Sequence, residues 1–339
     1  MRKEINIREI ARRCGVSPAT VSRAISGKAP VREETRLKIE EAVRQAGYQT
    51  DQQRRKQQRG RVRAIGVFVP RLDHAFFQKV LDQLHTLLDR RGDYMVILPE
   101  RGPETVEHIK RMNLDGVILL SEETSTATIR QLRRMHVSVV ICGALSLSRL
   151  CPAVHVDDLG AAYDGTNYLI NLGHRNIGFL CDSPRAISAG FQRITGCKKA
   201  MADRGLTPAE ELFCTCDSSY AGGYQAAARL IQKHPELTAI FAHSDAAAIG
   251  AMAALMDAGY AVPEDVSVLG FDDTELGEEF RPKLTCVAQP IAEIVSRSLD
   301  LLYAGMEQPG WEAPPAITLP HSFTIRDSVR SPKKTENQG

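Results

Sequence analysis

A polar helix face between Val16 and Gly27 carries the side chains in this chain that are best suited to chemical recognition. In its sequence, VSPATVSRAISG, three apolar side chains lie on one side of a helix, and the residues on the other side face outward. The residues left outside are Pro18, Ala19, Ser22, Arg23 and Ser26. A face of this composition, with a helix N-terminus behind it, suits insertion into the major groove of DNA. The spacing alone also fits an ordinary three-helix bundle with a polar surface.

Three short helices must position that face. Asn6 can cap the first helix together with Glu9, as in a capping box. The apolar stripe of this helix comprises Ile7, Ile10, Ala11 and Cys14. Ser17 caps the second helix, and Pro18 takes its first position, where the missing N–H has no partner to lose. Because helices this short are unstable alone, a third helix ended by Gly47 must complete a small core. Its inward residues are Ile39, Ala42, Val43 and Ala46.

The segment VSPATVSRAISG, followed by a helix that ends in GY, closely resembles the DNA-binding module of the lactose-repressor family of bacterial regulators. The resemblance continues through the rest of the chain. It implies that one group of residues reads bases, namely Pro18, Ala19 and Arg23. It implies that a second group contacts phosphates, namely Ser17, Thr20 and Ser22. Physically, Arg23 can form a bidentate pair with guanine, and Ala19 can contact a thymine methyl group. Lys28 completes the predicted DNA-binding residues of the head.

The distribution of charge agrees with DNA binding at one end of the chain only. Up to Arg63 there are 17 Lys and Arg residues against 7 Asp and Glu, a net charge of +10, and the remainder carries −8. A length of 339 residues indicates two or three domains. A basic head on an acidic body is expected of a protein that binds nucleic acid with one end, because the duplex repels the acidic part.

The sequence further predicts a cytoplasmic protein with no membrane segment, no cofactor and no metal. The N-terminus is charged, and no apolar run of a signal peptide follows it. No stretch approaches the roughly 18–20 apolar residues that a membrane span needs. We interpret all eight cysteines as reduced thiols. Cys214 and Cys216 form a C-x-C pair, for which a metal or redox role stays open as a minor alternative.

Residues 49–62 form a predicted basic linker that departs from the pattern of the resembling family. The stretch QTDQQRRKQQRGR holds five basic residues and five Gln. In the family this segment has an Ala and a Leu, and the Leu is wedged into the minor groove, which kinks the duplex. Here Arg54 stands at the Ala position and Gln57 at the Leu position, and a Gln cannot act as an apolar wedge. We expect Arg54, Arg55 and Lys56 to bind phosphates with little or no kink; a plain flexible tether is the alternative.

From Arg63 to Ser328, predicted strands alternate with predicted helices. The run AIGVFVP at 64–70 is apolar almost throughout, as expected for a strand buried on both faces of a parallel sheet. Two halves of this kind in series predict a two-lobed, periplasmic-binding-protein-like body with parallel sheets. With the three-helix helix-turn-helix head that precedes this body, the predicted fold class of the chain is α/β. The chain of the resembling family crosses between its lobes three times, so the resemblance implies crossings near Asp158, Ala288 and Pro320. The predicted boundaries are 1–48 for the head, 49–62 for the linker, 63–328 for the effector-binding and dimerisation domain (lobe 1 at 63–158 and 288–320, lobe 2 at 159–287 and 321–328) and 329–339 for a disordered tail.

In such folds a ligand sits at the carboxyl ends of the strands, in the cleft between the lobes. Arg193 with Gly196 looks like the R-x-x-G of the family, whose Arg holds the effector, and Asp272 matches the family's ligand-binding aspartate. Opposed across a cleft, an Arg and an Asp can take a vicinal diol between them. The predicted effector-binding residues are Phe76, Phe77, Arg193, Ser244, Asp272 and Gln289.

Five positions carry narrower expectations. We expect Phe77 to be buried and Phe76 to present its ring to the cleft. Asp245 should cap the helix that follows it. His174 should have a structural role before a strand. Ser218 lies where several relatives present an aromatic ring, so the stacking found in those relatives is not expected here.

The resemblance implies a homodimeric transcription factor, a repressor rather than an enzyme. Its two heads would bind the half-sites of double-stranded operator DNA, and a small effector closing the cleft would change operator affinity. A sugar or sugar derivative is expected, because most of the family answers to such ligands. A nucleoside is the alternative, since HVDDLGAAYDGTNYLINLGHRNIG and AHSDAAAIGA look like the nucleoside-responsive branch. A regulator without a small-molecule effector also fits the sequence, and a free sugar-binding transport protein would have the same kind of body.

Overall fold

The computed structural model describes most of the body and part of the head. The described residues are 7–21, 35, 37–39, 42, 62–99, 104–121, 126–135, 137–145, 150–182, 188–207, 209–308, 311, 314 and 316–333. They belong to two compact units, Met1–Val62 and Arg63–Gly339, and each unit is described by itself. The predicted DNA-binding residues Ser22, Arg23, Lys28, Arg54, Arg55 and Lys56 lie outside the described residues.

The first unit begins with helix α1 (Ile7–Cys14), which ends at Gly15 with φ +67°. The Ser17 hydroxyl accepts a hydrogen bond from the Thr20 backbone N at 3.1 Å, and residues 18–21 are helical. The predicted capping by Ser17 is therefore confirmed. Among the described residues of this unit, four buried side chains form a small core, namely Ile10, Ala11, Val21 and Ile39.

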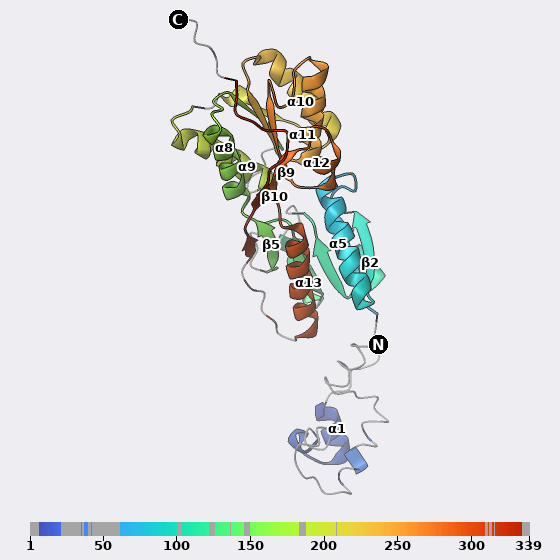
Figure 1. Ribbon diagram of the computed structural model, residues 1–339. Helices are drawn as coiled ribbons and strands as arrows, with labels where there is room; N and C mark the ends of the chain where they lie inside the picture. The colour runs from blue at the N-terminus through green and yellow to red at the C-terminus, as the bar shows by residue number, and fades with distance from the viewer. Residues whose placement is uncertain are drawn as a thin grey trace, which may run out of the picture. The chain divides into compact units, whose positions relative to one another are not determined.

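Lobe 1 of the second unit is built on a six-stranded sheet in the order β11-β5-β4-β3-β1-β2, with every pair parallel. The strands are β1 (Ala64–Val69), β2 (Tyr94–Pro99), β3 (Gly116–Leu119), β4 (Ser138–Cys142), β5 (Ala153–Val156) and β11 (Ile317–Leu319). Helices cover both faces of the sheet (Figure 1). One face packs against α5 (Ala75–Arg91) and α13 (Ile291–Glu307), the other against α6 (Glu104–Met112) and α7 (Thr126–Arg134).

Lobe 2 repeats this plan with strand order β12-β10-β9-β8-β6-β7, where only the β10–β12 pair is antiparallel among the strands of this sheet that the structure describes. The strands are β6 (Ile177–Cys181), β7 (Phe213–Thr215), β8 (Ala239–Ala242), β9 (Ser267–Asp272), β10 (Thr285–Ala288) and β12 (Ser322–Thr324). One face packs against α8 (Asp158–Asn171) and α9 (Ala189–Asp203), the other against α10 (Tyr220–Lys233) and α11 (Asp245–Asp257). Two short helices, η1 (Glu210–Leu212) and α12 (Glu275–Glu279), complete the lobe.

The chain passes between the two lobes three times. It leaves lobe 1 between β5 and α8, returns between β10 and α13, and leaves again between β11 and β12. The predicted α/β class with two largely parallel sheets is confirmed. Because the strands within each sheet are mostly parallel, their carboxyl ends gather at one edge of each lobe, where a cleft can form.

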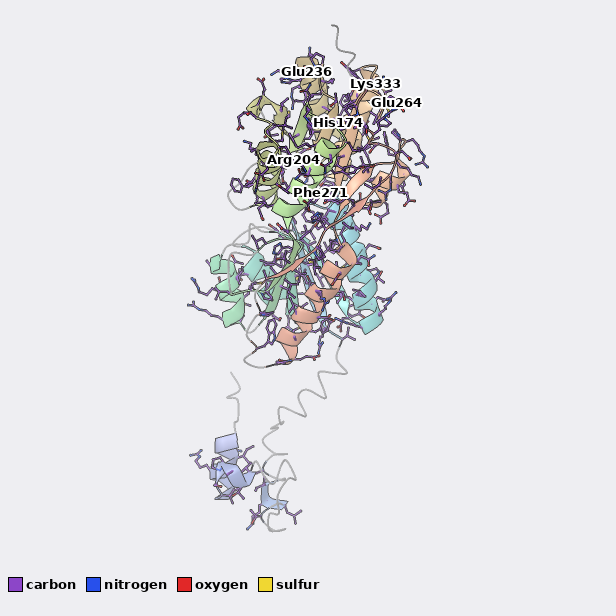
Figure 2. All side chains as sticks on the ribbon, turned by 60° about the vertical axis from the view of Figure 1, so that its left-hand side comes forward. His174, Arg204, Glu236, Glu264, Phe271 and Lys333 are labelled. Carbon is purple, nitrogen blue, oxygen red and sulfur yellow. The ribbon has the colours of Figure 1, made fainter. Side chains whose placement is uncertain are left out.

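The tail differs from the expectation of disorder from residue 329 onward. Residues 329–333 are described and lie along lobe 2. The Arg330 carbonyl contacts Nε2 of buried His174 at 2.9 Å, and Lys333 forms an ion pair with Asp265 at 2.6 Å. Figure 2 shows His174 and Lys333 at the outer end of lobe 2. The prediction was wrong for these five residues because a polar composition does not exclude specific hydrogen bonds to a folded lobe; residues 334–339 lie outside the described residues.

Two features concern the class of protein rather than the fold. All eight cysteines are free thiols, as predicted from the sequence. Within the described part of the chain, no helix is both long enough and apolar enough to cross a membrane.

Candidate ligand-binding site

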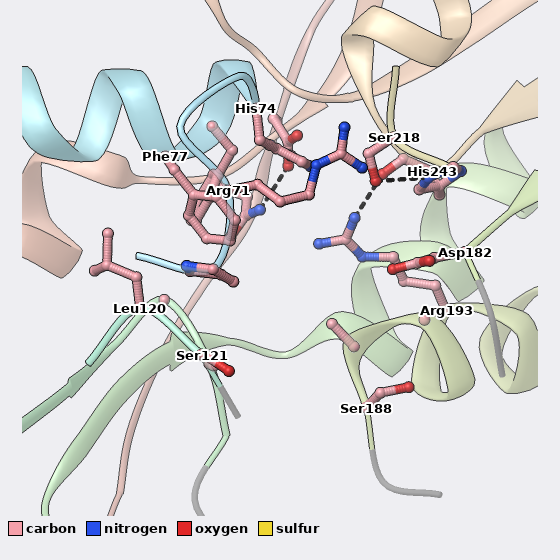
Figure 3. A pocket seen from close by; sticks show the side chains of 18 of the residues that line it. Arg71, His74, Phe77, Leu120, Ser121, Asp182, Ser188, Arg193, Ser218 and His243 are labelled. Carbon is pink, nitrogen blue, oxygen red and sulfur yellow. Dashed lines mark hydrogen bonds between the residues drawn. The ribbon is translucent and has the colours of Figure 1, made fainter. Parts of the chain in front are cut away.

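A cavity of about 360 Å³ opens between the lobes, and residues from both lobes line it. The lining residues on the lobe 1 side include Arg71, His74, Phe76, Phe77, Leu120 and Ser121. Lobe 2 contributes mostly polar residues, among them Asp182, Ser188, Arg193, Asp217, Ser218, His243 and Asp272. Gln289 lines the cavity where the chain returns to lobe 1. The cavity therefore has the aromatic and aliphatic side chains of lobe 1, beside Arg71, His74 and Ser121, facing a lobe 2 wall rich in hydrogen-bonding groups (Figure 3).

The ends of the strands determine which residues reach the cavity. Ser121 lies two residues after β3, Asp182 directly follows β6, and His243 directly follows β8. Asp272 is the last residue of β9, and Gln289 directly follows β10. The buried apolar strands fix these positions, since a parallel strand delivers its carboxyl end to the same edge as its neighbours.

The aromatic wall comes from the first turn of α5. The rings of Phe76 and Phe77 meet edge to face with centroids 5.6 Å apart, and His74 lies against Phe77 at 4.9 Å. Both Phe residues line the cavity, but Phe76 is the buried one, with 6% of its surface exposed, and Phe77 is only partly buried. The expected order of burial was wrong, because Phe76 shares the inward stripe of α5 with Val80 and Leu84.

Arg193 is held firmly in the polar wall. Its Nε donates a hydrogen bond to Asp158 at 2.8 Å, and its Nη1 donates to the His243 carbonyl at 2.6 Å. The guanidinium also lies over the ring of Phe271 at 3.6 Å. Gly196 explains the R-x-x-G spacing, since a Cβ there would lie 2.2 Å from the carbonyl oxygen of Leu159 in α8. The glycine thus permits the close approach of α8 and α9 that brings Arg193 to its partner Asp158.

Asp272 and Gln289 form a buried pair beside Arg193. Gln289 Nε2 donates a hydrogen bond to Asp272 Oδ1 at 2.7 Å, while Gln289 Oε1 has no hydrogen-bond partner. Burial raises the pKa of Asp272 to about 8. A neutral Asp272 can donate a hydrogen bond, and Gln289 Oε1 can accept one. Arg193 and Asp272 both belong to lobe 2, so the expectation that they oppose each other across the cleft was wrong.

Two residues at the start of α11 differ from the roles expected of them, because Ser244 is the helix cap and neither Ser244 nor Asp245 lines the cavity. Ser244 is the N-cap, and its hydroxyl accepts a hydrogen bond from Ala247 N at 3.3 Å, so it is not among the residues that line the cavity. Asp245 accepts hydrogen bonds from the backbone N and the hydroxyl of Thr274 at 2.6 and 2.9 Å. The helix begins one residue earlier than expected, at Asp245, which makes the serine the cap and directs the aspartate to the neighbouring loop.

His243 and Ser218 are the most specific additions to the predicted site. The His243 Nδ1 lies 3.1 Å from the Leu180 carbonyl, so this nitrogen carries the proton, and Nε2 accepts from the Ser218 hydroxyl at 3.0 Å. A serine beside an imidazole resembles half of a nucleophile–base pair. Burial lowers the pKa of His243 to about 4, which makes it a weak base. The arrangement favours recognition of a hydroxyl over nucleophilic catalysis.

Charges on the two sides of the cavity are complementary. Arg71 of lobe 1 is held by Asp73 at 2.9 Å, and Asp182 and Asp217 of lobe 2 also raise the pKa of its guanidinium. The buried Nδ1 of His74 has no hydrogen-bond partner, and burial lowers the pKa of this side chain to about 4.

Sequence reasoning did not single out His74, Asp182, Asp217 or His243, although three of them follow within two residues of an apolar strand. That position was the available signal.

Comparisons with known proteins identify the family. Residues 6–51 match the family described as bacterial regulatory proteins, lacI family, and residues 166–329 match the periplasmic binding protein-like domain. The chain is 30% identical over 308 residues to the HTH-type transcriptional repressor CytR of Escherichia coli K12, covering 89% of each chain. The chain belongs to the LacI family. As a LacI-family member it is a DNA-binding transcription regulator with a helix-turn-helix domain and a periplasmic-binding-protein-like body.

Two solved structures of transcriptional regulators resemble the chain over most of its length. The CelR–cellobiose complex is 26% identical with a TM-score of 0.69, and the match covers 96% of this chain and 100% of that one. A LacI-family regulator from Enterococcus faecium with bound ribose is 28% identical with a TM-score of 0.72, covering 80% and 100%. Both of those proteins are regulators solved with a sugar.

Proposed function

We propose that this LacI-family chain is a repressor whose affinity for operator DNA is controlled by a small molecule, a sugar or sugar derivative, bound between its lobes. The observation that carries the proposal is the cavity itself, with an aromatic wall from lobe 1 facing hydrogen-bonding groups of lobe 2. Sugars present an apolar ring face and a rim of hydroxyls, which match these two walls. The sugar complexes of two similar regulators support the same ligand class.

Specific groups receive the ligand in this proposal. Phe77 contacts the ring face, and Arg193 donates to hydroxyl oxygens. Neutral Asp272 donates to a hydroxyl, and the unpartnered Oε1 of Gln289 accepts from one. The Ser218 oxygen, whose proton is committed to His243, accepts a further hydroxyl. Because these groups come from both lobes, the ligand favours the arrangement in which the walls are close.

The head supplies the DNA contacts. Ser17, Pro18 and Ala19 are exposed at the start of the second helix, where the resemblance assigns phosphate and base contacts. We propose that the protein acts as a homodimer, because two heads are required to read two operator half-sites about one helical turn, or a near multiple, apart. Linkage then requires that a ligand which weakens operator binding is itself bound less tightly by the operator complex.

A nucleoside is the second candidate ligand. The neutral Asp272 and the Oε1 of Gln289 form an adjacent donor and acceptor, which is the pattern that reads the edge of a base. Phe77 could stack on such a base. The two ligand classes are compared directly in one experiment.

A thermal-shift screen of the purified protein against sugars, sugar phosphates and nucleosides tests the proposal. A ligand at 100 times its dissociation constant should stabilise the fold by about 2.7 kcal/mol. A gel shift on a selected operator then gives the sign of its effect. Asp272→Ala should lose the ligand response and keep operator binding, whereas Asp257→Ala, outside the cavity, should keep both. Absence of stabilisation by every ligand, or a normal response in Asp272→Ala, would overturn the proposed site.

A further inference from the structure

Lys79 on α5 of lobe 1 contacts lobe 2 at Asp273, the residue that follows Asp272 of the cavity. Its Nζ donates a hydrogen bond to the backbone carbonyl of Asp273 at 2.8 Å and forms an ion pair with Glu275 at 3.2 Å. The side chains of Lys79 and Glu275 are 27% and 69% exposed, so solvent screens the ion pair. The hydrogen bond from a charged donor to the carbonyl is the stronger of the two contacts.

The backbone that Lys79 contacts is in an unusual conformation. Asp272 and Asp273 have φ values of +112° and +62°, in the region that favours glycine. Residues other than glycine rarely adopt such φ values unless the surrounding structure holds the backbone in place. Arg326 pairs with Asp273 at 2.8 Å, and Thr324 donates to it at 2.8 Å, so lobe 2 holds the side chain. Lys79 holds the backbone carbonyl from the opposite lobe.

The helix that carries Lys79 also forms part of the cavity. Phe76 lines the cavity and lies three residues before Lys79, on the adjacent turn of the same helix face. Asp272, whose carboxyl also lines the cavity, is one peptide unit away from the carbonyl that Lys79 contacts. A movement of α5 relative to lobe 2 therefore changes the aromatic wall and the hold on this turn together.

We propose that Lys79 is a positioning residue that couples closure of the lobes to the orientation of Asp272. With the lobes together, Lys79 fixes the Asp273 carbonyl, and the turn keeps the Asp272 carboxyl in the cavity and bonded to Gln289. When the lobes separate, this contact is lost, and the turn relaxes from its unfavourable φ values. The proposal rests on the proposed function only in that the cleft is the effector site.

Hydrogen exchange on the full-length, ligand-free protein tests the coupling. Lys79→Met removes the ammonium and keeps the length of the side chain. Peptides covering residues 271–277 should exchange about three- to tenfold faster, since loss of a charged hydrogen bond makes local opening easier. Lys79→Arg, which keeps a donor, should restore most of the protection. The matched control is Lys199→Met, because Lys199 pairs with Asp203 of its own helix and lies over the ring of Tyr163, and both of these partners belong to lobe 2.

Lys79→Gln, which removes the charge and shortens the side chain but keeps it polar, carries the test if Lys79→Met fails to fold; it should raise exchange at least about twofold. Equal exchange rates at residues 271–277 in the Lys79→Met and Lys199→Met proteins would overturn the proposal. Calorimetry with cellobiose, D-ribose and uridine gives a second readout, and any of these that binds should bind Lys79→Met at least about threefold more weakly. An unchanged response in Asp272→Ala would refute the proposed effector site, while the ligand-free exchange result would still decide the role of Lys79.

Discussion

Gln289 donates a hydrogen bond to Asp272 at 2.7 Å and thereby joins the acid of the cavity to the segment through which the chain returns to lobe 1. Asp272 ends β9, and Gln289 directly follows β10, its parallel neighbour in the sheet. A ligand that changes this hydrogen bond acts directly on one of the three connections between the lobes. The pair is therefore placed to convert binding into a relative movement of the lobes.

The state of the Asp272 carboxyl should be visible in the pH dependence of stability. Its pKa is raised to about 8 by burial, from an ordinary value of 3.8. Between these values the folded protein retains a proton that the unfolded chain releases, so stability falls as the pH rises, by up to about 1.4 kcal/mol per pH unit. Asp272→Asn mimics the neutral acid and should lose this dependence.

Urea unfolding of the parent and Asp272→Asn at pH 5, 6.5 and 8 provides the measurement. The free energy of unfolding of the variant, relative to the parent, should increase from pH 5 to pH 8. The comparison cancels contributions from His74 and His243, which titrate in both proteins. A difference that stays constant over this range would mean that Asp272 is already charged in the folded protein.

Removal of the Arg193 guanidinium should cost both stability and ligand binding. The carboxylate of Asp158, with a side chain only 3% exposed, would lose its partner in Arg193→Met. Loss of one partner of a buried ion pair destabilises a protein by roughly 3–5 kcal/mol. Adding Asp158→Asn should recover part of that loss without restoring ligand binding. Arg297→Met, which removes an exposed helix-surface pair with Glu293, is the control and should change stability by less than about 0.5 kcal/mol.

Arg23→Ala should relax the base preference at one position of the operator. Loss of a bidentate contact to guanine costs roughly 1–3 kcal/mol of discrimination. Selection of operators from a randomised pool by parent and variant measures the effect, and binding to unrelated DNA serves as the control. Selected sites with the same base preference in both proteins would remove Arg23 from the residues that read bases.

The linker should leave operator DNA nearly straight. Gln57 stands where the family has its leucine, and its polar side chain cannot be inserted between base pairs as an apolar wedge. End-to-end energy transfer on a labelled operator should therefore report little or no bending by the parent. Gln57→Leu is the matched variant and should increase the bend. A marked bend with the parent protein would contradict the prediction.

Sequence patterns predicted the class and layout of this protein because they depend on burial. Apolar runs such as 64–70 became central strands, and the polar residues after such runs lie around the cavity. Arg193, Asp272 and Gln289 reach it, as do both Phe residues, although their roles toward a ligand stay predictions. The burial of Phe76 is predictable from the sequence, because its i, i+4 spacing to Val80 marks the buried face of α5.

Details that depend on a single residue's position could not be predicted from pattern. Ser244 and Asp245 are both good caps, and only the backbone angles at the start of α11 decide which one serves. The hydrogen bond between Ser218 and His243 joins residues 25 positions apart on different strand ends, which no local spacing reveals. The same holds for Lys79 and Asp273, whose contact depends on how the two lobes meet.

The three passages between the lobes have a consequence for synthesis of the protein. Lobe 1 is made of two stretches of chain, and α13 and β11 are translated only after most of lobe 2. Until then α5 alone covers one face of the lobe 1 sheet, and the part that packs against Leu299 and Leu302 of α13 stays exposed for on the order of ten seconds of elongation. A nascent chain in this state presents apolar surface to chaperones. For the same reason, lobe 1 cannot be produced as a folded fragment from one continuous piece of the gene.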